Sequence, residues 1–298
     1  MRIAIACGGT GGHIFPGLAT ANELVRRGHD VTLWMAGKDV ENEAVKGWKG
    51  HVITVPAQGF PSTISLAAVG TSVRLIRAIL RVRRDMRTNR PDVVLAMGSY
   101  ASVGPVGAAI LLGVPVVLHE SNVIPGRAVR LLSRWATVVA GCFEEMRFYL
   151  RRRKVVITGM PLRHELVEAS FAGAGNSDGN YRILVMGGSR GARRLNEVVT
   201  DALVRLRSEG IPVAAVHLAG EQDGPDVERR YREGGVPAEV MAFTRDMGRL
   251  YRSVDFTICR SGAATCAELL TFGLPSLLIP YPHAIHDHQT ANAKAMEK

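Results

Sequence analysis

The feature that most constrains the fold is a pattern that occurs twice: an apolar strand, a glycine-rich turn and then a helix. Residues 2–7 predict the first strand, and Gly8-Gly9-Thr10-Gly11-Gly12-His13 follows it. Residues 182–186 predict the second, followed by Gly187-Gly188-Ser189-Arg190-Gly191. A strand that runs through a tight turn into a helix is the repeating unit of parallel sheets with right-handed crossovers. The chain is therefore predicted to contain two doubly wound α/β domains.

Further apolar runs predict the other elements of both domains. Thr158-Gly159-Met160-Pro161 predicts a hinge, which gives an N-terminal domain of residues 1–160 and a C-terminal domain of residues 161–298. The segment 170–180, rich in Gly, Ser and Asn, is expected to be a mobile loop. In the first domain we expect helices at 16–27 and 66–87 and a seven-stranded sheet, with strands at 2–7, 31–35, 52–55, 92–97, 114–118, 138–140 and 155–157. In the second we expect helices at 195–207 and 226–234, and strands at 182–186, 213–218, 240–242, 256–259 and 276–279.

Length and cysteine content indicate an ordinary cytoplasmic protein. The 298 residues are enough for two domains. The four cysteines contain no CxxC pair, which argues against a disulfide framework and a zinc site.

Residues 96–118 carry no charge and are numerous enough to cross a bilayer, but glycines and prolines interrupt them. We expect a loop, a short helix and a buried strand there instead.

The formal net charge of +10 points to an anionic partner. A nucleic acid, an anionic membrane surface or a phosphate-bearing substrate would each fit. The predicted helix over residues 74–87 carries six of the arginines among apolar residues. It is either a helix with a solvated charged face or a contact for anionic lipid, worth about 1 kcal/mol per basic residue. Nucleic acid is disfavoured, because no aromatic side chains suited to base stacking lie among these arginines.

The glycine-rich turns are typical of phosphate sites. A helix N-terminus offers unpaired N–H groups and a partial positive charge, and glycine lets the ligand approach. A third turn of this kind, Arg260-Ser261-Gly262-Ala263-Ala264-Thr265, precedes a helix. The simpler interpretation is that any doubly wound fold needs tight turns after its strands. A dinucleotide site is disfavoured because neither main turn fits G-x-G-x-x-G and no acidic residue closes the second strand. A P-loop is excluded because no Gly-Lys-Ser/Thr follows any of these glycines.

Two side chains near these turns are candidates for chemistry. His13 lies at the start of the first helix, whose positive end favours a neutral imidazole able to accept a proton. Glu268 could accept hydrogen bonds from a ribose diol, although it could also simply stabilise its helix. His283, His286 and His288 match no common zinc spacing, and no Asp-x-Asp pair would hold Mg²⁺. We therefore expect no metal and no cofactor.

Five motifs together resemble one family. They are GGTGGHIFPGLA at residues 8–19, LHESNVIPG at 118–126, GGSRGARRLN at 187–196, CRSGAATCAEL at 259–269 and DHQTANA at 287–293. As a set, spread over nearly the whole chain, they resemble the MurG family, the peptidoglycan N-acetylglucosaminyltransferases that convert lipid I to lipid II. The resemblance implies a GT-B fold, two Rossmann-like domains with a cleft between them. It also implies inverting, metal-independent transfer from UDP-N-acetylglucosamine to undecaprenyl-pyrophosphoryl-MurNAc-pentapeptide, at the cytoplasmic face of the membrane as a peripheral protein.

The resemblance also assigns residues. His13 would be the general base for the acceptor's 4-hydroxyl. Thr10, Gly11 and Gly12 would line the cleft, and Asn122 would contact the donor sugar. Arg163 and Ser189 would contact the phosphates of the donor, Thr244 its uracil, and Gln289 the sugar hydroxyls. The diphosphate and the ribose would be held by the stretch Ala263, Ala264, Thr265, Cys266, Ala267 and Glu268, with Glu268 on the ribose hydroxyls.

Two departures from the family pattern leave alternatives open. Gly98-Ser99-Tyr100 stands where the family usually has Gly-Gly-Tyr, and the chain ends at Lys298 where the family continues. A UDP-sugar-dependent diacylglycerol glycosyltransferase is one alternative. The other is a donor-binding module made inactive by C-terminal truncation.

Overall fold

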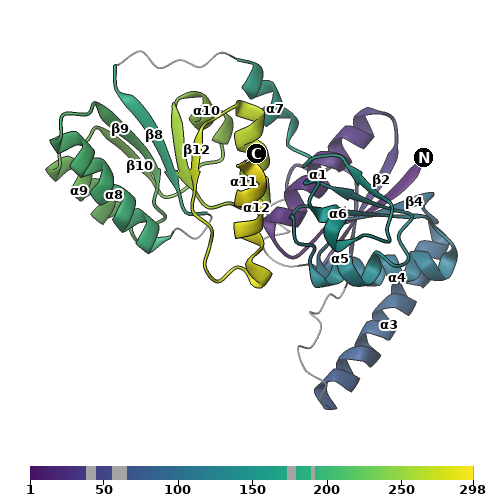
Figure 1. Cartoon of the computed structure of the whole chain (residues 1–298). Helices are drawn as coiled ribbons and strands as arrows, with labels where there is room; N and C mark the ends of the chain where they lie inside the picture. The colour runs from purple at the N-terminus through teal and green to yellow at the C-terminus, as the bar shows by residue number, and fades with distance from the viewer. Residues whose placement is uncertain (38–44, 56–65, 173–178, 189–191, 298) are drawn as a thin grey trace. The chain divides into compact units, whose positions relative to one another are not determined.

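The computed structural model describes residues 1–37, 45–55, 66–172, 179–188 and 192–297, with the backbone alone for 66–74. The chain divides into two compact units, Met1–Arg163 and His164–Lys298. Each unit has its own parallel sheet with helices packed against it (Figure 1). The predicted pair of doubly wound α/β domains is confirmed.

The first unit contains a seven-stranded sheet of order β3-β2-β1-β4-β5-β6-β7, with every pairing parallel. All seven predicted strands are present. They are β1 (Arg2–Ala6), β2 (Asp30–Met35), β3 (His51–Thr54), β4 (Val93–Ala96), β5 (Val116–Glu120), β6 (Val138–Gly141) and β7 (Val155–Ile157). The helices are α1 (Gly11–Arg26), α3 (Leu66–Thr88), α4 (Val103–Leu112), α5 (Arg127–Leu132) and α6 (Met146–Tyr149), with the short helix η1 (Tyr100–Ser102).

The alternation of side chains along β1 divides the first core in two. Ile3 and Ile5 pack in one cluster with Ile14 and Leu18 of α1. The alanines between and after them, Ala4 and Ala6, belong to a second cluster that includes residues of α3 and α4. This is the period-2 arrangement of a strand buried on both faces. On the second face α3 approaches α4 closely because Gly107 has no side chain, and a Cβ there would lie 2.8 Å from Ile79 Cδ1.

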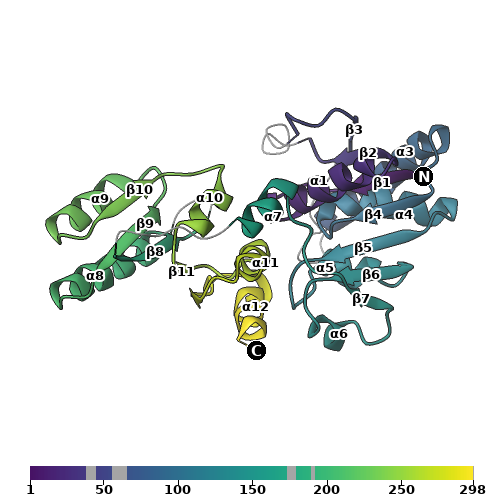
Figure 2. The same cartoon turned by 90° about the horizontal axis from the view of Figure 1, so that it is seen from above.

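The second unit contains a five-stranded parallel sheet of order β10-β9-β8-β11-β12. Figure 2 shows α8 and α9 side by side along β8, β9 and β10. The strands are β8 (Tyr181–Met186), β9 (Val213–Leu218), β10 (Ala238–Met241), β11 (Phe256–Cys259) and β12 (Ser276–Leu278). The helices are α7 (His164–Phe171), α8 (Arg193–Ser208), α9 (Gly224–Glu233), α10 (Met247–Arg252), α11 (Ala263–Phe272) and α12 (His288–Met296), with the short helix η2 (Ile285–Asp287).

A buried polar network ties three elements of the second unit together. The His217 side chain is fully buried on β9, and its Nε2 lies 3.1 Å from Asn196 Oδ1 of α8. Tyr231 of α9 donates its hydroxyl to His217 Nδ1 at 2.9 Å, and Asn196 Nδ2 donates to Asp223 Oδ2 and to the Ala219 carbonyl, each at 2.9 Å. Burial lowers the pKa of His217 to about 4, which keeps the ring neutral. The network fixes the start of α8, directly after the second glycine-rich turn.

Some predicted boundaries were wrong. The first helix begins at Gly11 rather than at residue 16, because the N–H groups of His13 and Ile14 already bond the Thr10 carbonyl. Pro16 lies inside this helix, where it costs one hydrogen bond. Helices α5, α6, α7 and α10 were not predicted. Within the segment predicted to be a mobile loop, α7 extends to Phe171, and residues 173–178 lie outside the described part of the chain.

The uncharged segment 96–118 folds as expected into a turn, helix α4 and strand β5. In the parts of the chain that the structure describes, no helix has both the length and the apolar character that spanning a bilayer requires.

The strand orders show where each sheet reverses its direction of growth, which is where ligands of such sheets bind. In the first unit the chain moves outward from β1 to β3 and then returns to β4 on the other side of β1. In the second unit the same reversal occurs between β8 and β11. Ligands of open parallel sheets bind beyond the carboxyl ends of the strands at such switch points. The first and third glycine-rich turns follow β1 and β11, so both lie at these positions.

Candidate functional site

His13 lies at the switch point of the first unit, in the opening turn of α1. Its Nδ1 is 2.7 Å from the carbonyl oxygen of Met97, the residue after β4. A carbonyl oxygen can only accept, so Nδ1 carries the proton and Nε2 holds the lone pair. Burial lowers the pKa of His13, against a smaller opposing effect of the Met97 hydrogen bond. The ring is therefore neutral near pH 7 and presents a basic nitrogen.

The turn before His13 leaves backbone donors at the helix end. Thr10 is the N-cap residue, exposed and without a side-chain capping bond. The first bonds of the helix are made by His13 and Ile14 to the Thr10 carbonyl, so the N–H groups of Gly11 and Gly12 have no acceptor within α1. Gly9 has a φ of +99°, which lets the chain turn from β1 into the helix.

A second group of polar side chains follows β5 at the same sheet edge. Glu120 is buried, and its carboxylate accepts hydrogen bonds from the N–H groups of Asn122 and Gly126, at 2.9 and 2.8 Å. It also accepts one from Asn122 Nδ2 at 3.2 Å. Burial raises the pKa of Glu120, while these hydrogen bonds lower it. Glu120 therefore fixes the loop that carries Asn122, which is itself half-buried.

His119, the residue before Glu120 on β5, interacts electrostatically with His13. Its side chain is buried, and Nε2 lies 3.4 Å from the Gly159 carbonyl and 3.7 Å from Cys142 Sγ. Burial lowers the pKa of His119 to about 4, and the electrostatic effect of His13 adds to this shift. The backbone also brings β4 and β5 together here: a Cβ on Gly98 would lie 2.8 Å from the His119 carbonyl. The structure thus places His13 and the Asn122 loop at adjoining strand ends.

Arg163 is the last residue of the first unit and is exposed. Its guanidinium carbon lies 5.9 Å from the centre of the Phe15 ring, which is on α1 two residues after His13. This distance is within the range of a cation–π contact. Arg163 therefore lies beside the same helix as His13.

In the second unit the candidate site is built on the N-terminus of α11. Gly262 is the N-cap residue, and the Cys266 N–H bonds its carbonyl at 2.9 Å. The N–H groups of Ala263, Ala264 and Thr265 therefore have no acceptor within the helix. Such an end attracts a phosphate group. Cys266 directs its thiol into the core and its N–H to Gly262, whereas Ala264, Thr265, Ala267 and Glu268 are partly exposed.

Glu268 is held by a residue that sequence analysis did not single out. The hydroxyl of Tyr251 on α10 donates to Glu268 Oε2 at 2.7 Å. Tyr251 is buried, and its ring centre lies 5.1 Å from that of Phe272 at the end of α11. The carboxylate therefore has a defined position at the edge of the α11 turn.

The start of α12 is tied to the same turn. Ser261 is fully buried, and its hydroxyl donates to the Gln289 carbonyl at 2.8 Å, while Asn292 Nδ2 donates to the Ser261 carbonyl at 3.1 Å. The side-chain oxygen of Gln289 accepts from the Tyr281 N–H at 2.9 Å. The amide oxygen of Gln289 therefore has a partner within the second unit, and the amide group is oriented by this bond. The structure brings Gln289 and the predicted residues of α11 together.

The other two predicted donor residues are placed differently. Ser189 lies outside the described residues. Thr244 follows the edge strand β10, and its hydroxyl accepts from the Asp246 N–H at 3.1 Å. Asp246 in turn caps α10 by accepting from the Arg249 N–H at 3.0 Å. The turn with Thr244 therefore leads directly into the helix that carries Tyr251.

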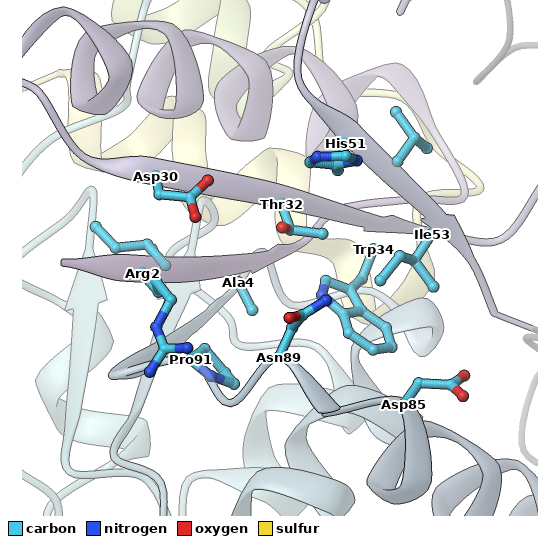
Figure 3. A pocket seen from close by; sticks show the side chains of 12 residues that line it. Arg2, Ala4, Asp30, Thr32, Trp34, His51, Ile53, Asp85, Asn89 and Pro91 are labelled. Carbon is cyan, nitrogen blue, oxygen red and sulfur yellow. The ribbon is translucent and has the colours of Figure 1, made fainter. Parts of the chain in front are cut away.

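Neither the histidines near the C-terminus nor the cavity of the first unit adds to these sites. Among the residues described, no three His, Cys, Asp or Glu side chains group as metal ligands would. A cavity of about 270 Å³ lies at the amino ends of β1, β2 and β3, lined by Arg2, Asp30 and His51, with Asp85 and Asn89 opposite (Figure 3). That is the edge opposite to the glycine-rich turn, and its described lining includes no predicted site residue.

Sequence analysis missed Glu120, His119 and Tyr251. The first two stand in the His-Glu-Ser-Asn motif, so their polar character in an otherwise apolar strand end was a usable signal. Tyr251 had no such signal, because its role depends on how α10 packs against α11.

Comparison with known proteins identifies the family. Residues 3–141 match the glycosyltransferase family 28 N-terminal domain, and residues 182–298 match the glycosyltransferase family 28 C-terminal domain. The chain is 41% identical to the UDP-N-acetylglucosamine--N-acetylmuramyl-(pentapeptide) pyrophosphoryl-undecaprenol N-acetylglucosamine transferase of Ectopseudomonas mendocina, over 100% of this chain and 82% of that protein. It is 36% identical to the protein of the same name from Geobacter sulfurreducens, over 100% of this chain and 83% of that one.

A solved structure agrees with the sequence relatives. The crystal structure of Acinetobacter baumannii MurG superimposes with a TM-score of 0.80 at 30% identity, over 99% of this chain and 82% of that one. Together with the two parallel-sheet units, these similarities establish the GT-B fold class. The chain belongs to the MurG family of GT-B glycosyltransferases, within glycosyltransferase family 28.

Proposed function

We propose that the protein transfers N-acetylglucosamine from UDP-N-acetylglucosamine to the 4-hydroxyl of the N-acetylmuramoyl residue of lipid I, which produces lipid II for peptidoglycan synthesis. Relatives that carry the corresponding name at 35–41% identity over the whole chain support the substrates. The observation that carries the chemistry is the neutral His13 whose Nδ1–H is directed to the Met97 carbonyl.

The acceptor hydroxyl needs a base, and His13 has the properties of one. Its Nε2 lone pair would take the proton as the hydroxyl oxygen attacks the sugar C1. The imidazolium that forms would keep its Nδ1–H bond to Met97, a stronger bond once the donor is charged. Thr10, Gly11, Gly12 and the Asn122 loop would line the same side. A general base contributes about 10²–10⁴ to the rate of such a step.

The donor would be held mainly by the second unit. The free N–H groups at the start of α11 suit the diphosphate, with Arg163 and Ser189 as further phosphate contacts. Glu268 would accept from the ribose hydroxyls, Thr244 would face the uracil, and the Gln289 amide together with Asn122 would donate to the sugar. The first residues of α11, which are Ala263, Ala264, Thr265, Cys266 and Ala267, would surround the diphosphate and the ribose together with Glu268.

We further propose that transfer inverts the configuration at C1 and requires no metal. The acceptor oxygen forms the new bond to C1 as the bond from C1 to the diphosphate oxygen breaks, and UDP leaves. The negative charge that develops on UDP needs a positive partner. The N-terminus of α11 would supply one without a cation, since its N–H dipoles are directed out of the helix end at which we propose that the diphosphate binds.

A membrane contact on α3 fits a lipid-linked acceptor. Ile76 and Leu80, one helical turn apart, have exposed fractions of 57% and 51%. Arg77, Arg81 and Arg84 are exposed on the same stretch of helix. Exposed apolar residues among arginines are typical of helices that lie on anionic bilayers. We propose that this face of α3 binds the cytoplasmic membrane surface as a peripheral contact.

The test is a transfer assay with purified protein, UDP-N-acetylglucosamine and a lipid I analogue. Formation of the disaccharide product is expected, with loss of product in His13→Ala. Donor binding without transfer would leave a donor-binding module, and transfer to diacylglycerol but not to the lipid I analogue would assign the alternative acceptor.

A further inference from the structure

The hydroxyl of Tyr251 on α10 contacts the carboxylate of Glu268 on α11, which is a predicted ligand-binding residue. The donor hydroxyl and the acceptor oxygen Oε2 are 2.7 Å apart, which is a short hydrogen bond to a carboxylate. Tyr251 is 1% exposed, so its hydroxyl is buried away from bulk water, where losing a hydrogen bond is costly. The contact is therefore a fixed part of the second unit.

The position of Tyr251 is itself set by close packing. Gly248, three residues before it, is buried against α7, where a Cβ would lie 2.8 Å from Ala169 Cβ. Asp246 caps the same helix through the Arg249 N–H. On the other side, the Tyr251 ring packs against Phe272 of α11. A short helix held at three points leaves the phenol little freedom.

A glutamate that binds a ligand at this position gains affinity when another residue already fixes its side chain. Its side chain has several rotatable bonds, and immobilising them on binding costs about 0.5–1.5 kcal/mol. A carboxylate has two oxygens and about four acceptor positions, so a bond from Tyr251 is compatible with hydrogen bonds from ribose hydroxyls. A carboxylate already oriented by the protein binds a diol with less loss of entropy.

We propose that Tyr251 is a positioning residue for donor recognition: it orients the Glu268 carboxylate toward the ribose hydroxyls of the UDP moiety. This inference rests on the proposed function, in which Glu268 binds the ribose. It predicts that the Tyr251 hydroxyl acts on ribose recognition alone, and not on the acceptor or on the chemical step.

The experiment measures the affinity of UDP and of 2′,3′-dideoxy-UDP by calorimetry, for the whole chain, for three single variants and for the double variant Tyr251→Phe/Glu268→Gln. Tyr251→Phe removes the hydroxyl and keeps the ring against Phe272. Glu268→Gln tests the ribose contact itself. The matched control is Tyr231→Phe, which removes another buried tyrosine hydroxyl of the same unit, the one bonded to His217.

The wild type is expected to prefer UDP over the dideoxy nucleotide. Tyr251→Phe should reduce this preference by about 3- to 10-fold, the effect of one hydrogen bond, and Tyr231→Phe should leave it unchanged. In the Glu268→Gln background, Tyr251→Phe should cause no further loss of preference, because the two residues act as one unit. Transfer assays should show a higher KM for the donor with kcat little changed.

Two results overturn the inference while the ribose assignment stands: Tyr251→Phe keeps the full preference, or it weakens both nucleotides equally, which is what a general loss of packing would do. If Glu268→Gln also keeps the wild-type preference, the ribose contact assigned to Glu268 is wrong and the inference falls with it. Thermal unfolding of each variant separates lost stability from lost recognition.

Discussion

His13 Nδ1 lies 2.7 Å from the Met97 carbonyl oxygen, and the two residues are 84 positions apart in the chain. The bond joins the first turn of α1 to the end of β4, across the switch point of the sheet. It decides which nitrogen of the ring is basic. An isolated histidine exchanges between two tautomers, whereas this one is held in the form with its lone pair on Nε2.

Replacing His13 should slow catalysis strongly without weakening donor binding. In His13→Ala we expect turnover to fall by about 10² or more, since the general base is lost. The affinity for UDP should stay within about twofold of the wild type, because the proposed UDP contacts are on other residues. Initial-rate kinetics and calorimetry measure the two quantities. Unchanged turnover would remove His13 from the role of base.

The pH dependence of kcat/KM should reflect the lowered pKa of His13. A base works only when unprotonated, so activity is expected to fall as the pH decreases through the folded-state pKa of His13. Because burial lowers this pKa from 6.5, the midpoint of the acid limb should lie below pH 6.5. A midpoint at or above 6.5 would contradict this. Stability should be checked at each pH, because the pKa of His119 is also low.

Glu268→Ala should weaken UDP binding by about 1–3 kcal/mol, the cost of losing charged hydrogen bonds to the ribose. This corresponds to roughly 5- to 150-fold in Kd. Calorimetric titration with UDP measures it. Glu197→Ala is a suitable control, because that glutamate forms ion pairs with the exposed Arg193 and Arg194 at the surface of α8. Equal affinity in both variants would move the ribose contact elsewhere.

The second unit should lose stability as the pH falls from 6.5 to 4. His217 has a pKa of about 4 when folded and about 6.5 when unfolded. Above pH 6.5 both states are neutral and the folded state keeps this contribution in full; between 6.5 and 4 only the unfolded state binds the proton. The loss reaches about 3 kcal/mol near pH 4. Urea titrations at each pH, followed by hydrogen exchange in peptides from β9, would measure this free energy of unfolding.

The control for this prediction is His217→Gln, which cannot titrate in that range. It should be less stable than the wild type at pH 7.5, and the difference should shrink toward pH 4. If the two proteins lose stability in parallel, another group is responsible.

Chelation of divalent metals should leave transfer intact. Because the α11 N-terminus is proposed to stabilise the leaving diphosphate, we expect the full rate in EDTA. The measurement is the initial rate with and without EDTA, followed by addition of Mg²⁺ or Mn²⁺. Loss of activity in EDTA and its recovery with a cation would instead assign a metal to the diphosphate or to the histidines around residues 283–288.

The sequence was sufficient for the architecture. Apolar strands bounded by glycine and proline predicted both sheets. The structure then showed that the first and third glycine-rich turns follow strands at the switch points. The predicted helix boundaries were wrong where the local preference of a residue differs from what tertiary packing favours. Pro16 is a favoured first residue of a helix, yet α1 begins at Gly11, because packing of Ile14 and Leu18 on β1 extends the helix toward the turn.

The site was predicted less completely. His13 and Glu268 stand out by type and position, but their partners do not. Met97 contributes a backbone carbonyl, which any residue has, and Tyr251 is reached only through the packing of two helices. Contacts of this kind depend on tertiary structure and have no local pattern in the sequence.

The exposed Ile76 and Leu80 on α3 have a consequence for kinetics. If this face holds the enzyme on the bilayer, the lipid-linked acceptor is found by diffusion in two dimensions. The rate would then depend on the mole fraction of acceptor in the vesicle, and adding vesicles without acceptor would slow the reaction by surface dilution. Ile76→Ser/Leu80→Ser should lose this dependence, whereas Val25→Ser/Val198→Ser, which alters valines with exposed fractions of 49% and 46%, should retain it.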